Sequence, residues 1–279
     1  MNSPQLPICC NTEAFGTMEN LSRDLDAPQS LLSAAVAISL HAIPDASVKE
    51  AQRRITAMSR VVSSRVHGTQ VQALVAHLHE FLFEELGMEG NASDYYNPNN
   101  SLFPSVLRTH KGLPITLSLL YKLVGDGIGL NVWGVGLPGH FVAGVDMGNG
   151  KSALVDTFAG GRLLGLDEAK DRVANHFGNQ VEWSSRLIEP VTNRYWITRI
   201  LQNLLTSYGK TGQYAEISAV LEMELLLWPE ESRLQRDLAV VLARVGKQDL
   251  ASEWLEHYLH NNPEDPNGED LRQLLASLS

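Results

Sequence analysis

The chain has 279 residues, of which 44% are hydrophobic, so it is long enough to bury one large or two modest cores. Its 22 Lys and Arg residues against 32 Asp and Glu residues give a formal net charge of −10. This charge opposes binding to nucleic acid or to an anionic membrane surface, and we expect neither as a partner. No apolar run approaches the roughly 20 residues of a membrane span, and residues 1–12 lack the features of a signal peptide, so we expect a cytoplasmic location.

The two cysteines are neighbours, Cys9 and Cys10, in a polar stretch that contains prolines. They provide neither a disulfide framework nor a paired zinc motif, and we expect no cofactor and no metal. We interpret residues 1–26 as a flexible tail, because nothing nearby would lower a thiol pKa for a nucleophile on a mobile arm. His77 and His79 are two residues apart on an expected helix, so they face different directions as ordinary surface side chains.

Helical periodicity dominates residues 27–87, where we expect three helices. In the second helix, apolar residues at alternating steps of three and four share one face: Val48, Ala51, Ile55, Met58 and Val62. Asp45 or Ser47 is suited to cap this helix, because Pro44 interrupts the chain just before it.

A turn-rich loop follows at residues 90–100, and its composition is polar except for the neighbours Tyr95 and Tyr96. Paired tyrosines in such a loop either line a binding cleft or clamp the loop to the surface, and the sequence supports both readings equally. With Asn100 at the end of the loop, these residues are our candidate cleft rim.

The middle of the chain changes from helix to strand. Pro114 suits the first turn of an apolar helix that runs to about Val124. Backbone N–H groups in the first turn have no partner within the helix, so the N–H that proline lacks is not missed there. Short segments rich in β-branched and aromatic residues follow, and they predict strands at residues 131–135, 141–145 and 152–155. Residues 147–150, Met-Gly-Asn-Gly, join the last two as a hairpin, so we expect a helix packed against a small antiparallel sheet.

The last part of the chain contains an internal repeat. Gly212 recurs as Gly246 and Pro229 recurs as Pro263, and the two intervals are equal. Their common length is the tetratricopeptide period of about 34 residues. Each such repeat is a helix pair that cannot bury its apolar face alone, and a helix at residues 269–278 is placed to cap the stack. Two repeats are fewer than the three or so that are normally stable alone, so we expect the array to pack against the preceding domain.

Two residues in the expected sheet carry the chemistry of a catalytic site. His140 opens one strand and Asp156 ends the next, so the hairpin can bring them together as cross-strand neighbours. A carboxylate beside an imidazole fixes its tautomer and raises its basicity. The pair would supply the base and the orienting group of a nucleophile, base and orienter triad.

Four segments of the chain resemble bacterial SirB proteins, and they lie at residues 100–102, 112–117, 138–141 and 156–161. The resemblance implies an α+β fold. A helix-rich, transglutaminase-like (papain-like) core with a small antiparallel sheet would be followed by an all-α tetratricopeptide array packed against it. The corresponding domains are a tail at residues 1–26, the transglutaminase-like domain at 27–190 and the helical domain at 191–279.

The resemblance places the superfamily's nucleophilic cysteine at Pro114 and its histidine and aspartate at His140 and Asp156. Proline supplies neither a nucleophile nor a backbone donor, so the ordinary thiol mechanism is excluded. Ser118 is the one plausible substitute, because it lies a turn deeper on the same side of the helix, although such a serine more often bonds to the preceding carbonyl. Without a nucleophile, His140 and Asp156 form a structural pair, line a retained cleft or activate water.

We therefore expect a non-enzymatic protein-interaction or regulatory protein. Its helical half would bind a protein or peptide partner, and the negative charge favours a basic or neutral peptide. The alternative is a hydrolase or acyl transferase that uses His140 and Asp156 with Ser118 or an activated water.

Overall fold

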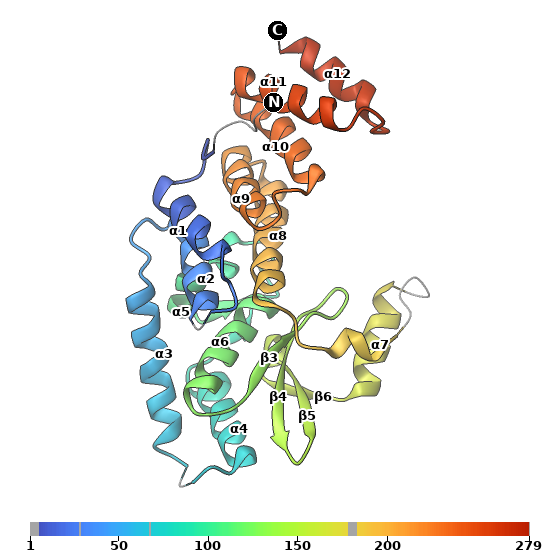
Figure 1. The fold of residues 1–279 in the computed structure, drawn as a ribbon. Helices are drawn as coiled ribbons and strands as arrows, with labels where there is room; N and C mark the ends of the chain where they lie inside the picture. Colours follow the sequence, from blue (N-terminus) through green and yellow to red (C-terminus); the bar gives the residue numbers. More distant parts are fainter. Residues whose placement is uncertain (1–5, 28, 67, 178–182, 279) are drawn as a thin grey trace. The chain divides into compact units, whose positions relative to one another are not determined.

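The computed structural model describes residues 6–27, 29–66, 68–177 and 183–278 (Figure 1). Helices predominate and are accompanied by small sheets, which confirms the expected α+β class. The chain divides into two compact units. The sheet-containing unit is Ala46–Trp196, and the helical unit combines the residues up to Asp45 with Ile197–Ser279. This division differs from the expected domains, because the N-terminal residues belong with the C-terminal helices. Within the described ranges no helix has the length and apolarity to cross a bilayer.

The sheet-containing unit contains several helical segments, and those that matter most for the site are capped or have a proline in the first turn. The segments are α3 (Val48–Ser63), α4 (Val71–His79), the π-helix Glu80–Glu85, α5 (Phe103–Thr109), α6 (Pro114–Gly127) and α7 (Leu166–Phe177). Ser47 caps α3 by accepting a hydrogen bond from the backbone N–H of Glu50, so of the two candidate caps Ser47 is the one used. Pro114 occupies the first turn of α6 as expected, and most of this helix is buried.

The principal sheet is antiparallel with strand order β3-β4-β5-β6. Its strands are β3 (Val132–Val135), β4 (Val142–Gly148), β5 (Lys151–Asp156) and β6 (Arg162–Leu164), of which β6 was not expected from the sequence. Asn149 and Gly150 turn between β4 and β5 with positive φ angles of 54° and 72°, as a two-residue type I′ hairpin requires. The expected hairpin is thus confirmed.

A two-residue parallel pairing connects the polar loop to the start of α6. It joins β1 (Glu89–Gly90) to β2 (Lys111–Gly112), which ends two residues before Pro114. Short 3-10 helices lie at Pro98–Asn100, Thr157–Ala159 and Ser185–Ile188. Asn100 and Thr157 both lie close to the N-terminal end of α6, because the carbonyl of Asn100 accepts from the N–H of Leu113 at 3.2 Å and the hydroxyl of Thr157 donates to the carbonyl of Pro114 at 3.3 Å.

Trp196 closes the core of the sheet-containing unit at the start of α8 (Asn193–Thr211). It is 1% exposed, its indole N–H donates to the carbonyl of Ile115 at 3.2 Å, and its ring centroid lies 4.9 Å from that of Phe141. Gly134 makes room for this ring, since a Cβ at that position would lie 2.4 Å from it. The large aromatic side chain thereby joins the sheet to the first turn of α6.

The C-terminal helices recur with a regular spacing. They are α9 (Tyr214–Leu227), α10 (Ser232–Val245), α11 (Gln248–Asn261) and α12 (Gly268–Ser277). The interval between the two repeated glycines recurs among the helix ends. It separates the last residue of α8 from the last residue of α10. It also separates the first and last residues of α9 from those of α11. Gly212 and Gly246 follow α8 and α10 with positive φ angles of 67° and 80°. The recurrence seen in the sequence is therefore a recurrence of helix pairs.

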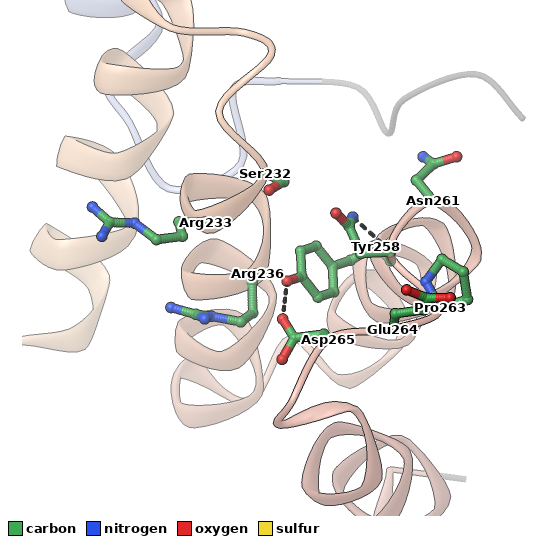
Figure 2. Close-up of a pocket in the computed structure, with 9 residues that line it drawn as sticks. Ser232, Arg233, Arg236, Tyr258, Asn261, Pro263, Glu264 and Asp265 are labelled. Atoms are coloured by element: carbon green, nitrogen blue, oxygen red, sulfur yellow. Dashed lines mark hydrogen bonds between the residues drawn. The ribbon is translucent and has the colours of Figure 1, made fainter.

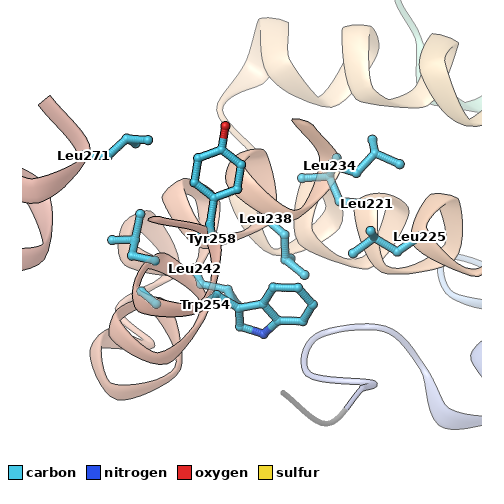
Figure 3. Packing of buried hydrophobic residues seen from close by; sticks show 11 residues of the cluster. Leu221, Leu225, Leu234, Leu238, Leu242, Trp254, Tyr258 and Leu271 are labelled. Atoms are coloured by element: carbon cyan, nitrogen blue, oxygen red, sulfur yellow. The ribbon is translucent and has the colours of Figure 1, made fainter. Parts of the chain in front are cut away.

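Aliphatic and aromatic side chains fill the space between α9, α10, α11 and α12 (Figure 3). Leu238, Leu242 and Leu255 are fully buried there, with Trp254 and Tyr258 of α11 beside them. This cluster is the core of the helical unit.

The helical unit also contains the first helices, α1 (Thr12–Ser22) and α2 (Ser30–Leu40). Asn11 caps α1 by accepting hydrogen bonds from the N–H groups of Glu13 and Ala14, and α1 packs against α2 and α9. Cys10 is 6% exposed. In the described residues, the stretch expected as a flexible tail therefore contains a capped helix, preceded by a partly buried segment.

Candidate functional site

His140 and Asp156 meet at one end of the β4-β5 pair. A tight turn over Gly139, whose φ is 70°, brings His140 to the start of β4, while Asp156 ends β5. Their Nε2 and Oδ1 atoms are 3.1 Å apart. The Asp156 side chain is 2% exposed and that of His140 is 18% exposed, so the imidazole retains access to solvent. The expected proximity of the two residues is confirmed.

The Asp156 carboxylate has a second role in shaping the chain. The same oxygen accepts a hydrogen bond from the backbone N–H of Ala159 at 3.2 Å and caps the 3-10 helix Thr157–Ala159. The backbone carbonyl of Asp156 accepts from the N–H of Gly161 at 3.0 Å. This aspartate therefore holds both the imidazole and the turn that follows β5.

Thr157 connects this pair to Pro114, the residue at which the sequence resemblance predicts a nucleophile. Its hydroxyl donates to the carbonyl of Pro114 at 3.3 Å and lies 3.0 Å from the hydroxyl of Ser118, and all three residues are buried. Pro114 is the residue four positions before Ser118, so Thr157 stands between Ser118 and the carbonyl that such a serine commonly bonds directly. The helix start is thus closed by a pair of buried hydroxyls, with no exposed nucleophile among Pro114, Ser118 and Thr157.

Asn100 organises the polar loop from inside. It is 2% exposed, and its side-chain amide donates to the carbonyls of Asp94 at 2.7 Å and Tyr95 at 3.1 Å and accepts from the amide of Asn91 at 2.9 Å. Its backbone carbonyl accepts from the hydroxyl of Thr116 at 2.7 Å. Asn100 is therefore a buried support of the loop, which corrects its expected place on a cleft rim, because its amide satisfies three local hydrogen bonds.

Tyr95 and Tyr96 are exposed, and their rings meet edge to face with centroids 5.5 Å apart. Tyr95 also packs edge to face on Phe158 at 6.0 Å. Phe158 in turn covers Gly90, where a Cβ would lie 2.4 Å from its ring. Tyr95 therefore contacts the short helix that directly follows Asp156. Sequence reasoning missed the roles of Thr157 and Phe158, although both follow Asp156 directly.

His79 packs in a partly buried aromatic cluster, which corrects its expected place as an ordinary surface side chain. Its Nε2 atom lies 2.9 Å from the hydroxyl of Tyr121, and its ring packs edge to face against Phe83 at 5.7 Å. Burial lowers the pKa of His79 to about 4 and raises the pKa of Tyr121. The imidazole is therefore neutral at pH 7 and serves as a packed hydrogen-bonding partner. Within the described residues no group of three or more His, Cys, Asp or Glu side chains is placed to hold a metal ion.

A pocket of about 460 Å³ opens in the helical unit at the C-terminal end of α11 (Figure 2). It is lined by polar groups from α10, α11 and the segment after α11: Ser232, Arg233, Arg236, Tyr258, Asn261, Asn262, Glu264 and Asp265, with Pro263. The hydroxyl of Tyr258 donates to Asp265, the guanidinium of Arg236 donates to Asp237, and Asn262 donates to the Tyr258 carbonyl. Much of the polar lining is thus paired within the chain.

Comparisons with known proteins place the sheet-containing unit in a family. A family model described as the transglutaminase-like superfamily matches residues 45–202, more than half of the chain. A UPF0162 protein of Xylella fastidiosa (strain 9a5c) is 28% identical over 91% of this chain and 92% of its own length, and one of Vibrio cholerae is 20% identical over 92% and 94%. Human F-box only protein 21 is 25% identical over 78% of this chain and 39% of its own length. No solved structure is significantly similar.

Proposed function

Because this chain belongs to the transglutaminase-like superfamily, we propose that it keeps the framework of a cysteine-enzyme site without the nucleophile and acts as a non-enzymatic protein-interaction or regulatory protein. The single observation that carries the proposal is the environment of Pro114. It is buried in the first turn of α6, and its carbonyl accepts from the buried hydroxyl of Thr157. A thiolate at this helix start would be the nucleophile of the superfamily, and proline cannot replace it.

In this proposal the helical unit binds the partner. The chain would then have the arrangement of SirB proteins, in which a transglutaminase-like domain is followed by tetratricopeptide repeats. The helix pairs of the helical unit recur at one fixed interval, and this regularity supports its assignment as a tetratricopeptide array. Such arrays present continuous surfaces that hold peptide segments. With a net charge of −10, a basic or neutral segment is the favoured partner.

The alternative function is hydrolysis or acyl transfer, and the geometry of His140 and Asp156 is the observation that favours it. A carboxylate 3.1 Å from a partly exposed imidazole is the base and orienter of many hydrolases. The Ser118 form of this mechanism is disfavoured, because that hydroxyl is fully buried and lies 3.0 Å from Thr157. Activation of water by His140 is the remaining form.

Turnover of an activated ester separates the two functions. We expect the purified chain to hydrolyse p-nitrophenyl acetate no faster than its His140→Ala variant. His77→Ala is the matched control, because His77 is partly exposed and its Nδ1 atom lies 3.1 Å from the carboxylate of Glu80. Saturable turnover that disappears in His140→Ala and persists in His77→Ala would establish the enzyme instead.

Partner binding has its own test. We expect a pull-down with the full chain, analysed by mass spectrometry, to enrich a basic or neutral protein over beads without bait. For a basic partner, recovery should fall as salt rises, because screening weakens attraction to a chain of charge −10. No enrichment at any salt concentration would contradict the interaction function.

A further inference from the structure

The segment Leu6–Cys10, here called the N-terminal strap, lies against the helical unit as a bound peptide would. The side chains of Leu6, Ile8 and Cys9 pack against the apolar cluster of α9 to α12. The strap has neither helix nor strand structure of its own and ends at Asn11, which caps α1. Its apolar side chains therefore pack on the helices of the unit.

A buried carboxylate on α9 recognises the backbone of the strap. Glu222 is 0% exposed, and its two oxygens accept hydrogen bonds from the N–H groups of Ile8 at 2.6 Å, Cys9 at 2.8 Å and Cys10 at 3.4 Å. Ser218, one turn earlier on α9, donates its hydroxyl to the same carboxylate at 3.1 Å. Successive N–H groups in a turn form a concave anion-binding site, and here the anion is a side chain of the helical unit.

These contacts explain why a carboxylate is tolerated inside an apolar helix. A buried carboxylate is costly unless hydrogen bonds satisfy it, and three of the four donors described above belong to the strap. Recognition through backbone N–H groups does not depend on which side chains the segment carries. The same site on α9 would thus accept another segment with apolar side chains and free backbone donors.

We propose that the helical unit binds, at Glu222 and the adjoining apolar cluster, an uncharged segment with apolar side chains and consecutive free N–H groups, and that the N-terminal strap occupies this site in cis. The proposal rests on the function proposed above and names the chemistry of its partner. The strap regulates the site, because a tethered segment competes at an effective concentration on the order of millimolar. A partner segment in trans binds only the fraction of molecules whose strap has left.

The chain contains its own probe of strap release. Its two cysteines, Cys9 and Cys10, both lie in the strap. Burial raises the pKa of the Cys10 thiol to about 12 and also raises that of Cys9. Thiol alkylation is therefore slow while the strap is docked and faster when it leaves.

The experiment uses the full chain and a peptide with the sequence of residues 6–11, with serine at both cysteine positions and a fluorophore at its C terminus. Ile8→Asp introduces a charge where the strap packs on the apolar cluster and should speed iodoacetamide alkylation at least tenfold. The same variant should bind the peptide at least tenfold more tightly than the unchanged chain in fluorescence anisotropy, because more sites are vacant. Val61→Asp, the same kind of change at an exposed position of α3, should behave like the unchanged chain in both assays.

Glu222→Gln tests the recognition itself. In the Ile8→Asp background it should abolish peptide binding, whereas Glu230→Gln, at an exposed position, should leave binding intact. Circular dichroism of each variant verifies that the helices remain. Fast alkylation of Ile8→Asp without tighter peptide binding would overturn the assignment of the partner's chemistry. The proposed interaction function would then still be tested independently by the pull-down. Unchanged alkylation in Ile8→Asp, or rapid alkylation of the unchanged chain, would overturn the cis-docked strap.

Discussion

Replacing Asp156 should show that its pairing with His140 supports the fold. Asp156→Ala removes a buried acceptor that serves both the N–H of Ala159 and the ring of His140. A hydrogen bond to a charged group contributes about 1.5–3 kcal/mol. We use the lower end for each bond, because the partly exposed imidazole can regain a bond to water. The expected loss of unfolding free energy is then about 3 kcal/mol.

Two further variants divide this loss between its causes. Asp156→Asn keeps an acceptor oxygen of similar shape and should cost about 1 kcal/mol. His140→Ala removes one of these two bonds and should cost about 1.5 kcal/mol. The double variant His140→Ala with Asp156→Ala should recover about 1 kcal/mol relative to the sum of the single losses, because the residues are in contact.

Urea unfolding followed by circular dichroism gives these free energies, and an unchanged slope with urea concentration verifies that the unfolding reaction is the same. A loss below about 0.5 kcal/mol for Asp156→Ala would be typical of an ordinary surface site. That result would refute the claim that Asp156 supports the turn after β5. Strict additivity in the double variant would show that the contact between His140 and Asp156 contributes nothing to stability.

Two further changes test the core around α6. Burial lowers the folded-state pKa of His79 to about 4, below the unfolded value of about 6.5, so its contribution to stability is present above pH 6.5 and is lost as the pH falls toward 4. Urea unfolding should give about 2 kcal/mol less stability at pH 5 than at pH 7 from this group, and an equal pH dependence in His79→Phe would contradict the assignment. Gly134→Ala places a Cβ 2.4 Å from the Trp196 ring and should cost about 1–3 kcal/mol in the same assay, whereas Gly165→Ala, with no atom within 4 Å, should cost under about 0.5 kcal/mol. Equal losses in the two glycine variants would show that the Trp196 packing is not as close as described.

The parts of the fold that local patterns control were predictable from the sequence. Ser47 and Pro114 start α3 and α6 because a side-chain acceptor and a missing donor suit the first turn of a helix. The turn at Asn149 and Gly150 was predictable because few residues tolerate two consecutive positive φ angles. The regularly spaced glycines after α8 and α10 indicated the recurring helix pairs for the same reason.

Features that depend on distant contacts were not predictable from local patterns. The N-terminal strap has the composition of a flexible tail. Its backbone hydrogen bonds are made to Glu222, which lies more than 200 positions later in the chain. Asn100 lies in a segment with the composition of a surface loop, yet its side-chain amide is buried within the loop that it organises. The bond between Ser118 and Thr157 joins residues 39 positions apart, so the helix pattern indicated only the preceding carbonyl as a partner.

The proposal depends most on what surrounds Pro114. In Pro114→Cys, with Cys9 and Cys10 replaced by alanine, the new thiol would lie at the N terminus of α6, where unpaired N–H groups favour its anion. The carbonyl of Pro114 accepts a hydrogen bond from Thr157, and the preceding residue, Asp156, is hydrogen-bonded to His140. These contacts connect the start of α6 to the imidazole of His140, which could accept the proton of the new thiol. Burial of the site opposes ionisation, and the sign of the pKa shift shows which effect is larger.

The rate of iodoacetamide alkylation of Pro114→Cys against pH measures this pKa. If the framework of a cysteine-enzyme site persists and lacks only its nucleophile, the thiol pKa lies below the roughly 8.5 of a free cysteine and returns toward that value when His140→Ala is added. A thiol pKa at or above about 8.5, unaffected by His140→Ala, would contradict the proposal and leave His140 and Asp156 as parts of the fold alone.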